Sequence, residues 1–354
     1  MNHTMHATVL FLVVILLGSS IPATAEPSHR PLKEFAIAYQ PFASPAGVVM
    51  EVVQRDRLLK QALLKQRLSA RTTPFNAGID AIRAFKQGEV VMTTLGDMPA
   101  LELATTMPVT YCAQLKQNYA MVVGDKGLLP KDLKGKRIGN VFASSGHFAL
   151  LKVLHSGGLT EKDVTLVPMP VNQMSEALLK GSIDAFAAWE PTPSLIIANA
   201  PDRFSAVGRQ SSSAYLVANR NFAEKHSEAM RQVAAALQRA MTWLRQDKNL
   251  RKAVQWNIAT ISTFAATASH IQPEEISRVT ALDLAAIRYT PRIAPLTRTT
   301  GSLPLADEFE FLKSIGKISK EAYWETILNS FNRDIVDQVL RNAVKYNLKQ
   351  YSYE

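Results

Sequence analysis

Two strand–turn–helix units follow the same plan at separate places in this chain, and this repeat constrains the fold more than any other sequence feature. The first unit, FAIAYQPFASPAGVVMEVVQ, predicts a strand over Phe35–Tyr39 and a helix from about Ala46. The second, KRIGNVFASSGHFALLKVLHSGG, begins at Lys136 and repeats the order of strand, turn and helix. Both turns contain the tripeptide Phe-Ala-Ser, at residues 42–44 and 142–144.

A second pair of landmarks occurs in the same order after each unit. A helical pattern ends on a glycine, a strand follows, and the strand stops at an acidic residue close to a proline. Matching positions lie roughly 92 to 100 residues apart, so we predict two β/α lobes that are built alike. The landmarks are Ala84, Gly88, Asp97 and Pro99 in the first case and Ala177, Gly181, Glu190 and Pro191 in the second.

Alternating strands and helices predict parallel sheets with right-handed crossovers. In such sheets ligands bind beyond the carboxyl ends of the strands, where loops and helix N-termini converge. Two facing lobes would therefore form a cleft lined by matched turns. These turns are residues 39–44, 75–78, 95–99 and 139–154, with Trp189-Glu190-Pro191 as a fifth.

The last third of the chain is predicted to be helical. From about His226 onward, Met230, Val233, Leu237, Met241 and Leu244 fall on one face of a helix. Further helices are predicted to start near Pro273, Leu305 and Lys320, and a last one runs through residues 331–348.

The N-terminus has the pattern of an export signal. The apolar run Val9–Ser20 is too short to span a bilayer, and Ala-Thr-Ala at 23–25 supplies small residues for cleavage. We therefore interpret residues 1–25 as a signal peptide and expect a periplasmic protein. The n-region has no Lys or Arg, which leaves an uncleaved anchor as the alternative.

Charge and cysteine content restrict the class of ligand. The net charge is +10, and residues 1–25 contain no charged side chain, so the mature chain keeps all of it. A basic surface suits anionic ligands or lipid head groups, whereas the dispersed Lys and Arg residues do not form a nucleic-acid motif. Cys112 is the only cysteine, so no intramolecular disulfide can form.

Catalytic and cofactor motifs are missing from the sequence. Ser144, Ser145 and His147 lie on one turn, but no G-x-S-x-G elbow surrounds them and no Walker or G-x-G-x-x-G loop is present. The histidines of the mature chain lack H-x-x-x-H or H-E-x-x-H spacing. We expect neither an enzyme nor a metal or cofactor site.

Residues 132–191 resemble the periplasmic solute-binding proteins of ABC importers, in the nitrate, sulfonate and taurine group. The matching pieces are Asp-Leu-Lys-Gly-Lys at 132–136, the Ser/Gly turn that opens a helix, GGLTEKDV, ALLKGSIDA and Trp-Glu-Pro. The likeness is looser over residues 35–124 and from Tyr215 to about Asp337.

This resemblance implies a type II periplasmic binding fold, an α/β fold with two lobes, a hinge, a central ligand cleft and a helical C-terminal segment. Lobe 1 would comprise residues 32–123 plus 213–354, and lobe 2 residues 124–212. Residues 119–124 and 211–220 would cross between the lobes. The implied partners are a small anionic ligand and an inner-membrane ABC permease with its ATPase, and the implied state is a monomer.

By the same resemblance, the anionic head of the ligand would meet Ser144, Ser145, Gly146 and His147. Unpaired N–H groups and the dipole of a helix N-terminus favour an anion there, although helix capping explains the serines almost as well. For Trp189, the alternative to ligand contact is packing in the core. For Asp97 and Glu190, the alternative is capping of a turn or helix. The remaining candidates in the matched turns are Tyr39, Gln40, Phe42, Phe75, Asn76, Asp97, Trp189 and Glu190.

The sequence therefore predicts an exported binding protein for an aliphatic sulfonate or a taurine-like compound, which it delivers to an ABC permease. Nitrate or another small molecule, and a ligand-sensing role in the periplasm, stay open as alternatives. A pyrimidine-precursor synthase-like enzyme is disfavoured, because the cysteine-rich motif of those enzymes has no counterpart here.

Overall fold

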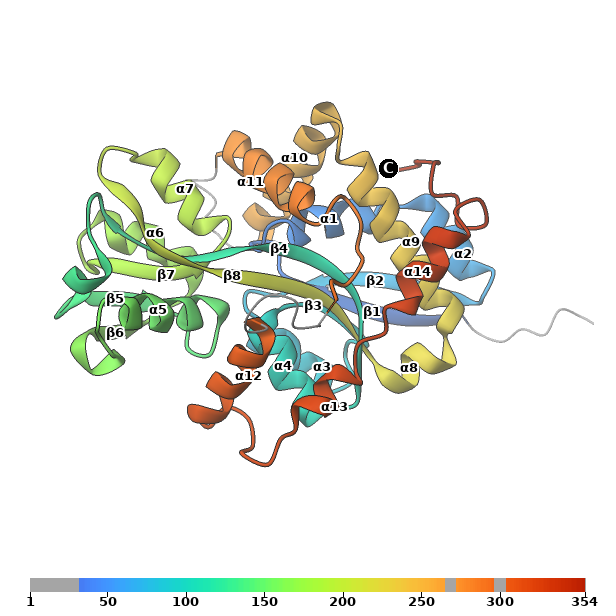
Figure 1. The fold of residues 1–354 in the computed structure, drawn as a ribbon. Coiled ribbons are helices and arrows are strands. Elements are labelled where there is room, and N and C mark those ends of the chain that lie inside the picture. The colour runs from blue at the N-terminus through green and yellow to red at the C-terminus, as the bar shows by residue number, and fades with distance from the viewer. Residues whose placement is uncertain (1–31, 265–271, 296–303, 354) are drawn as a thin grey trace, which may run out of the picture. The chain divides into compact units, whose positions relative to one another are not determined.

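The structure is a computed structural model that describes residues 32–264, 272–295 and 304–353 (Figure 1). The predicted signal peptide, residues 1–25, lies outside the described residues. The strands of the described residues are β1 Lys33–Tyr39, β2 Leu68–Pro74, β3 Met92–Gly96, β4 Val109–Asp125, β5 Arg137–Asn140, β6 Thr165–Pro168, β7 Ala185–Trp189 and β8 Phe204–Asn219.

These strands form one sheet in the order β2-β1-β3-β8-β4-β7-β5-β6. If β1, β2, β3 and β4 are exchanged with β5, β6, β7 and β8, the strand order read from the β6 edge equals the order read from the β2 edge. This symmetry agrees with two halves built alike. Strands are parallel within β1–β3 and within β5–β7, as predicted, and the sheet is antiparallel where β3, β8, β4 and β7 meet. We call the part around β1–β3 lobe 1 and the part around β5–β7 lobe 2.

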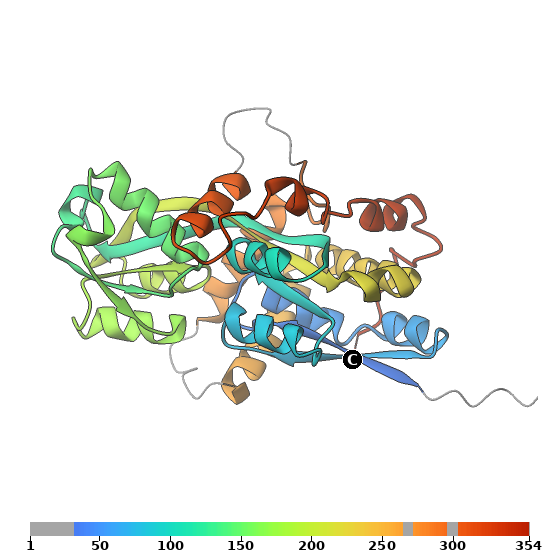
Figure 2. The same ribbon diagram turned by 90° about the horizontal axis from the view of Figure 1, so that it is seen from below.

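The prediction of separate parallel sheets is wrong at the centre of the molecule. Strands β4 and β8 have 17 and 16 residues and pair with each other from Val109 to Asp125. Because both crossing segments stay extended, the hydrogen-bonded ladder continues from one lobe into the other. Figures 1 and 2 show lobe 2 in green at one side, joined to the rest by these two strands. The lobe boundaries at 123/124 and 212/213 fall inside the strands and stay a prediction.

Helices cover both faces of the sheet. Two short 3-10 helices, at Pro130–Leu133 and Glu161–Asp163, accompany lobe 2. The α-helices are α1 Ala46–Val53, α2 Arg57–Leu64, α3 Gly78–Lys86, α4 Asp97–Thr106, α5 Ser145–Ser156, α6 Val171–Leu179, α7 Thr192–Asn199, α8 Arg220–Lys225, α9 Ser227–Trp243, α10 Asp247–Phe264, α11 Pro273–Ala286, α12 Pro304–Ser314, α13 Trp324–Leu328 and α14 Asp334–Arg341.

Alternation along the strands explains why both faces are covered. In β1, Phe35 and Ile37 belong to a core with α1 and α9, while Ala36 and Ala38 belong to a core with α3, α4 and α12. In β7, Ala185 and Ala187 face α5, and the intervening Phe186 belongs to a core with α6 and α7. Side chains alternate between the faces of a strand, so apolar residues at every position require a helix layer on each side.

Most predicted helices begin where their sequence signals lie. α1 begins at Ala46, α11 at Pro273 and α12 at Pro304, and the five apolar residues of the α9 face, Met230 to Leu244, are buried. The helix predicted near Lys320 is wrong. The Ser319 hydroxyl accepts a hydrogen bond from the Glu321 N–H at 3.2 Å, which stabilises a turn, and α13 starts later.

Helix α12 packs against both lobes. It contacts α4 in lobe 1, and its Phe311 ring lies 5.4 Å from the rings of His147 and Phe148 on α5 in lobe 2. Lys152 on α5 also lies 3.5 Å from Asp307 on α12. The C-terminal segment therefore closes one side of the space between the lobes.

A buried ion pair fastens the end of the chain to lobe 1. Arg239 on α9 donates from Nε to Asp56 Oδ2 at 2.9 Å and from Nη1 to the Tyr346 carbonyl at 2.7 Å. Asp56 also caps α2 by accepting from the Leu59 N–H at 2.9 Å. Both charged side chains are buried, so each depends on the other for its hydrogen bonds.

Candidate functional site

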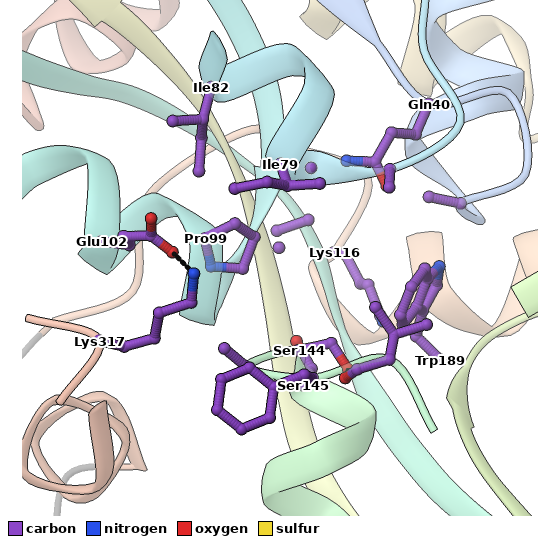
Figure 3. Close-up of a pocket in the computed structure, with 18 residues that line it drawn as sticks. Gln40, Ile79, Ile82, Pro99, Glu102, Lys116, Ser144, Ser145, Trp189 and Lys317 are labelled. Carbon is purple, nitrogen blue, oxygen red and sulfur yellow. Dashed lines mark hydrogen bonds and ion pairs between the residues drawn. The ribbon is translucent and has the colours of Figure 1, made fainter. Parts of the chain in front are cut away.

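The matched turns converge on a cavity of about 170 Å³ between the lobes (Figure 3). Lobe 2 contributes the start of α5 with Ser144 and Ser145, and in Figure 3 Gln40 and Ile79 of lobe 1 lie on the opposite side. The walls are mostly small or apolar. We call this space the inner cavity; its lining residues are Gln40, Ala43, Ala77, Gly78, Ile79, Ile82, Gly96, Pro99, Glu102, Lys116, Val141, Phe142, Ala143, Ser144, Ser145, Trp189, Ala214 and Lys317.

The N-terminus of α5 faces this cavity, and its serine hydroxyls are already engaged. Ser144 caps the helix: its Oγ accepts from the His147 N–H at 3.2 Å and donates to the Val141 carbonyl at 2.7 Å. The Ser145 hydroxyl donates to the Asp97 carboxylate of lobe 1. Helix geometry leaves the N–H groups of Ser145 and Gly146 without an intrahelical acceptor. The main-chain amides are therefore the free donors at this helix end.

Gly146 keeps α5 close to β7. A Cβ atom at this position would lie 2.7 Å from the Ala187 carbonyl oxygen, closer than real contacts allow. The glycine thus lets the first turn of α5 pack directly on the strand. It does not itself line the inner cavity.

Asp97 links the two lobes through hydrogen bonds. Its carboxylate accepts from the Ser145 hydroxyl, from the Met98 N–H at 3.0 Å and from the Ser213 N–H at 2.7 Å. Glu308 of α12 is also buried beside it, and burial together with the neighbouring Asp97 raises the pKa of Glu308 well above its usual range. This shift favours the neutral form of the Glu308 carboxyl group.

Lys116 is the functional candidate that sequence reasoning missed. It lies on the crossing strand β4, lines the inner cavity and is only 4% exposed. Its Nζ donates to Ser212 Oγ on β8 at 3.3 Å. Burial lowers the pKa of Lys116, and the carboxylates of Asp283 and Asp97 oppose that shift. The available signal was a lysine in the middle of a strand whose only other charged residue is the terminal Asp125.

An ion pair forms another polar part of the wall. Lys317, which follows α12, lies 3.7 Å from Glu102 of α4, as the dashed line in Figure 3 marks. Each charge of this pair is matched by its neighbour. Lys116 also lines the cavity, and its Nζ donates to the Ser212 hydroxyl instead of to a carboxylate.

Glu190 lies outside the inner cavity. It is 4% exposed, and its carboxyl group accepts from the Ser194 hydroxyl at 2.8 Å and from the Ser194 N–H at 3.2 Å at the start of α7. Burial raises the pKa of Glu190 to about 7, with Ser194 opposing the shift. Glu190 and Asp283, whose pKa burial raises to about 6, line a different cavity beside Asn118.

Three other predicted residues also point away from the inner cavity. The Tyr39 hydroxyl donates to Glu51 at 2.8 Å, and Phe75 packs in the core of α3 and α4. His147 is completely buried: its Nδ1 accepts from the Ala143 N–H at 3.1 Å, and its Nε2 lies 2.7 Å from Glu161 Oε1. Because Nδ1 accepts, the ring proton is on Nε2, and the ring stabilises the turn before α5.

A second space, which we call the outer groove, adjoins the inner cavity and has a volume of about 500 Å³. Phe42 and Asn76 line the outer groove, and Trp189 lines both spaces. Of the twelve predicted residues, the inner cavity thus brings together Gln40, Ser144, Ser145 and Trp189. The predicted residues that line neither space are Tyr39, Phe75, Asp97, Gly146, His147 and Glu190.

Within 32–264, 272–295 and 304–353, no three His, Cys, Asp or Glu side chains are grouped so that they could hold a metal ion. In the same part of the chain, no helix combines the length and apolarity needed to cross a bilayer.

Two β/α lobes, two crossing strands and a cavity between the lobes define the class of two-lobed solute-binding proteins. The model of the NMT1/THI5-like family matches residues 74–249. In sequence, it is 26% identical over 233 residues to the taurine-binding periplasmic protein of Escherichia coli, covering 61% of this chain and 70% of that protein. The predicted resemblance is confirmed.

Solved structures show the same fold. The alkanesulfonate-binding protein of Xanthomonas axonopodis pv. citri bound to MOPS aligns with a TM-score of 0.64 at 20% identity, covering 86% of this chain and 99% of that one. The periplasmic nitrate-binding protein of Synechocystis aligns with a TM-score of 0.62 at 11% identity, covering 91% and 92%. The predicted fold class, a two-lobed type II periplasmic binding fold, is confirmed.

Proposed function

We propose that this chain is an exported solute-binding protein that captures an organic sulfonate in the inner cavity and delivers it to an ABC permease. The observation that carries the proposal is the meeting of Lys116 and the α5 N-terminus in a cavity with mostly apolar walls. The names of the taurine-binding and alkanesulfonate-binding relatives support the same ligand class.

The anionic head group would lie between Lys116 and the first turn of α5. The main-chain N–H group of Ser145 and the helix dipole favour negative charge there. Lys116 adds a positive charge in surroundings that exclude water, where an ionic hydrogen bond is stronger than at the surface. A sulfonate has three acceptor oxygens and can contact both sides at once.

The organic part of the ligand would contact the apolar walls. These walls are formed by Ile79, Ile82, Pro99, Phe142 and Trp189. The Trp189 indole N–H is the one hydrogen-bond donor among these five side chains, so the walls suit an apolar group better than a second polar head group. Nitrate has no organic part, so it would leave these walls uncovered. The cavity therefore favours an organic sulfonate over nitrate, the alternative considered from the sequence.

A binding role fits the serines better than a catalytic role. The Ser144 hydroxyl donates to a carbonyl and the Ser145 hydroxyl donates to Asp97, which is held by two main-chain N–H groups. His147 is turned toward Glu161, so it does not face either serine hydroxyl as a general base would. The arrangement supports a site that holds its ligand without reacting with it.

Binding and delivery would depend on contacts with both lobes. A ligand that contacts Gln40 and Ile79 in lobe 1 and α5 in lobe 2 stabilises the closed arrangement of the lobes. The closed lobes would then present the surface that an inner-membrane permease with its ATPase recognises. Export to the periplasm through residues 1–25, and function as a monomer, complete the proposal.

The test is isothermal titration calorimetry of the mature protein with alkanesulfonates, taurine, nitrate, sulfate and pyrimidine precursors. We expect alkanesulfonates to bind and nitrate not to bind. A protein that binds nitrate or a neutral heterocycle but no sulfonate would refute the proposal, and turnover of a bound compound would show an enzyme instead.

A charge variant locates the head group. Ser144→Asp can still cap the helix but places a negative charge at the proposed anion site and loses the bond to the Val141 carbonyl, so sulfonate affinity should fall, while the melting temperature should fall no more than in the control. Ser156→Asp is the matched control, because Ser156 lies at the other end of α5 and away from the inner cavity. Equal affinities in both variants would move the head group elsewhere.

A further inference from the structure

The outer groove adjoins the inner cavity. The two spaces share Ala77, Val141, Phe142 and Trp189 as lining residues. The inner cavity, about 170 Å³, is smaller than the roughly 300–1,000 Å³ of cavities that hold drug-sized ligands, whereas the outer groove, about 500 Å³, lies within that range. The tail of a compound whose head group sits at α5 would have to pass between these four shared residues to reach the outer groove.

The walls of the outer groove are mostly apolar. They include Phe42 from lobe 1 and Phe142, Pro168, Met169, Pro170 and Trp189 from lobe 2. Phe142 is 57% exposed, which is unusual for a large aromatic side chain. An apolar ligand segment that covers this ring would remove its surface from water and would gain free energy in proportion to the area covered.

One buried polar group in the outer groove lacks a partner. Asn140, the last residue of β5, lines the groove and is only 3% exposed. Its Oδ1 has no hydrogen-bond partner among the described residues. A buried acceptor without a donor costs free energy, and a ligand hydroxyl or amine would remove that cost.

We propose that the outer groove is the binding subsite for the tail of the ligand, and that this tail is an apolar segment carrying a hydrogen-bond donor for Asn140. The inference rests on the proposed function, because it places the sulfonate head group in the inner cavity. The ligand is then an extended sulfonate, larger than taurine.

The test compares the affinities of linear alkanesulfonates of increasing length for the mature protein by calorimetry. Each methylene that enters the groove should tighten binding by about fourfold. If no sulfonate binds, the proposed function itself fails. If short and long sulfonates bind with the same affinity, only the extended tail is refuted.

Two wall variants separate the subsites. Phe42→Ala removes a wall of the outer groove but none of the inner cavity, so it should weaken the binding of long sulfonates on the order of tenfold and leave short ones unchanged. Ile79→Ala removes a wall of the inner cavity only and should weaken short and long sulfonates alike. An equal effect of Phe42→Ala on both ligand lengths would overturn the assignment. Phe42→Leu, which keeps most of the wall, shows whether any loss comes from the fold.

The donor on the tail is tested with hydroxyalkanesulfonates. At the chain length that reaches Asn140, the hydroxylated compound should bind more tightly than the plain one, and Asn140→Leu should remove this advantage. The opposite result, no advantage of a hydroxyl at any length in the unmodified protein, would refute the role of Asn140.

Discussion

The replacement Lys116→Met tests whether a buried cation on the crossing strand holds the ligand head group. Lys116 is 4% exposed and lines the inner cavity. A hydrogen bond to a charged group contributes about 1.5–3 kcal/mol, so its loss should raise the Kd of a sulfonate by about 10- to 100-fold. Methionine has a similar length and no charge, so it removes the interaction with little change in shape.

The same replacement should have little effect on folding. Burial is the largest influence on the pKa of Lys116 and lowers it, so the ammonium group costs free energy in the folded protein, while attraction to Asp283 and Asp97 offsets part of that cost. The two effects oppose each other, and we expect the melting temperature to change by less than about 4 °C.

Calorimetric titration with one alkanesulfonate measures the change in Kd, and Lys317→Met is the matched control. Lys317 lines the same cavity but is paired with Glu102 at 3.7 Å, and its side chain is 30% exposed. Such a pair contributes about 0–1 kcal/mol, so the control should change Kd by no more than about fivefold. An unchanged Kd in Lys116→Met, or equal losses in both variants, would refute the role of Lys116.

Three further predictions concern stability. The raised pKa of Glu190, about 7, means that the folded protein keeps a proton that the unfolded chain releases near pH 4.5, so stability falls as pH rises from about 4.5 to 7. Glu190→Gln should reduce the fall in melting temperature between about pH 5 and pH 8, and an identical fall would contradict this. Gly146→Ala should lower the free energy of unfolding by about 1–3 kcal/mol in guanidinium titrations, because its Cβ would lie 2.7 Å from the Ala187 oxygen; an unchanged midpoint would show that the turn can shift. Arg239→Met should cost about 3–5 kcal/mol by leaving Asp56 buried without its cation, and adding Asp56→Asn should recover part of this loss; no recovery would refute the pairing.

Local signals in the sequence predicted the parts of the fold that depend on neighbouring residues. The apolar run Phe35–Tyr39 and the helical pattern from Ala46 place β1 and α1, and the Ser144 cap places α5. The continuous sheet was not predictable in this way, because β4 pairs with β8 across about a hundred residues. Nothing in either strand alone indicates its partner.

The candidate site, like the fold, could be predicted only where it depends on residues that are neighbours in the sequence. The helix N-terminus at Ser144 follows from the order of strand, turn and helix, and the structure places Ser144 and Ser145 at the inner cavity. The pattern could not show that the hydroxyls are engaged with Val141 and Asp97, since one of these bonds joins different lobes. Lys116 was missed because the burial of a lysine depends on the residues packed around it and not on its neighbours in sequence.

Helix α12 bears on how long a captured molecule stays in place. Its Phe311 packs on α5 in lobe 2 while the helix also contacts α4 in lobe 1. Moving the lobes apart would therefore separate α12 from one of its two neighbours and break the contact between Lys152 and Asp307. This separation adds to the barrier for ligand escape, so α12 would lengthen the residence time of the ligand by slowing dissociation, even though no atom of Phe311 lines the inner cavity.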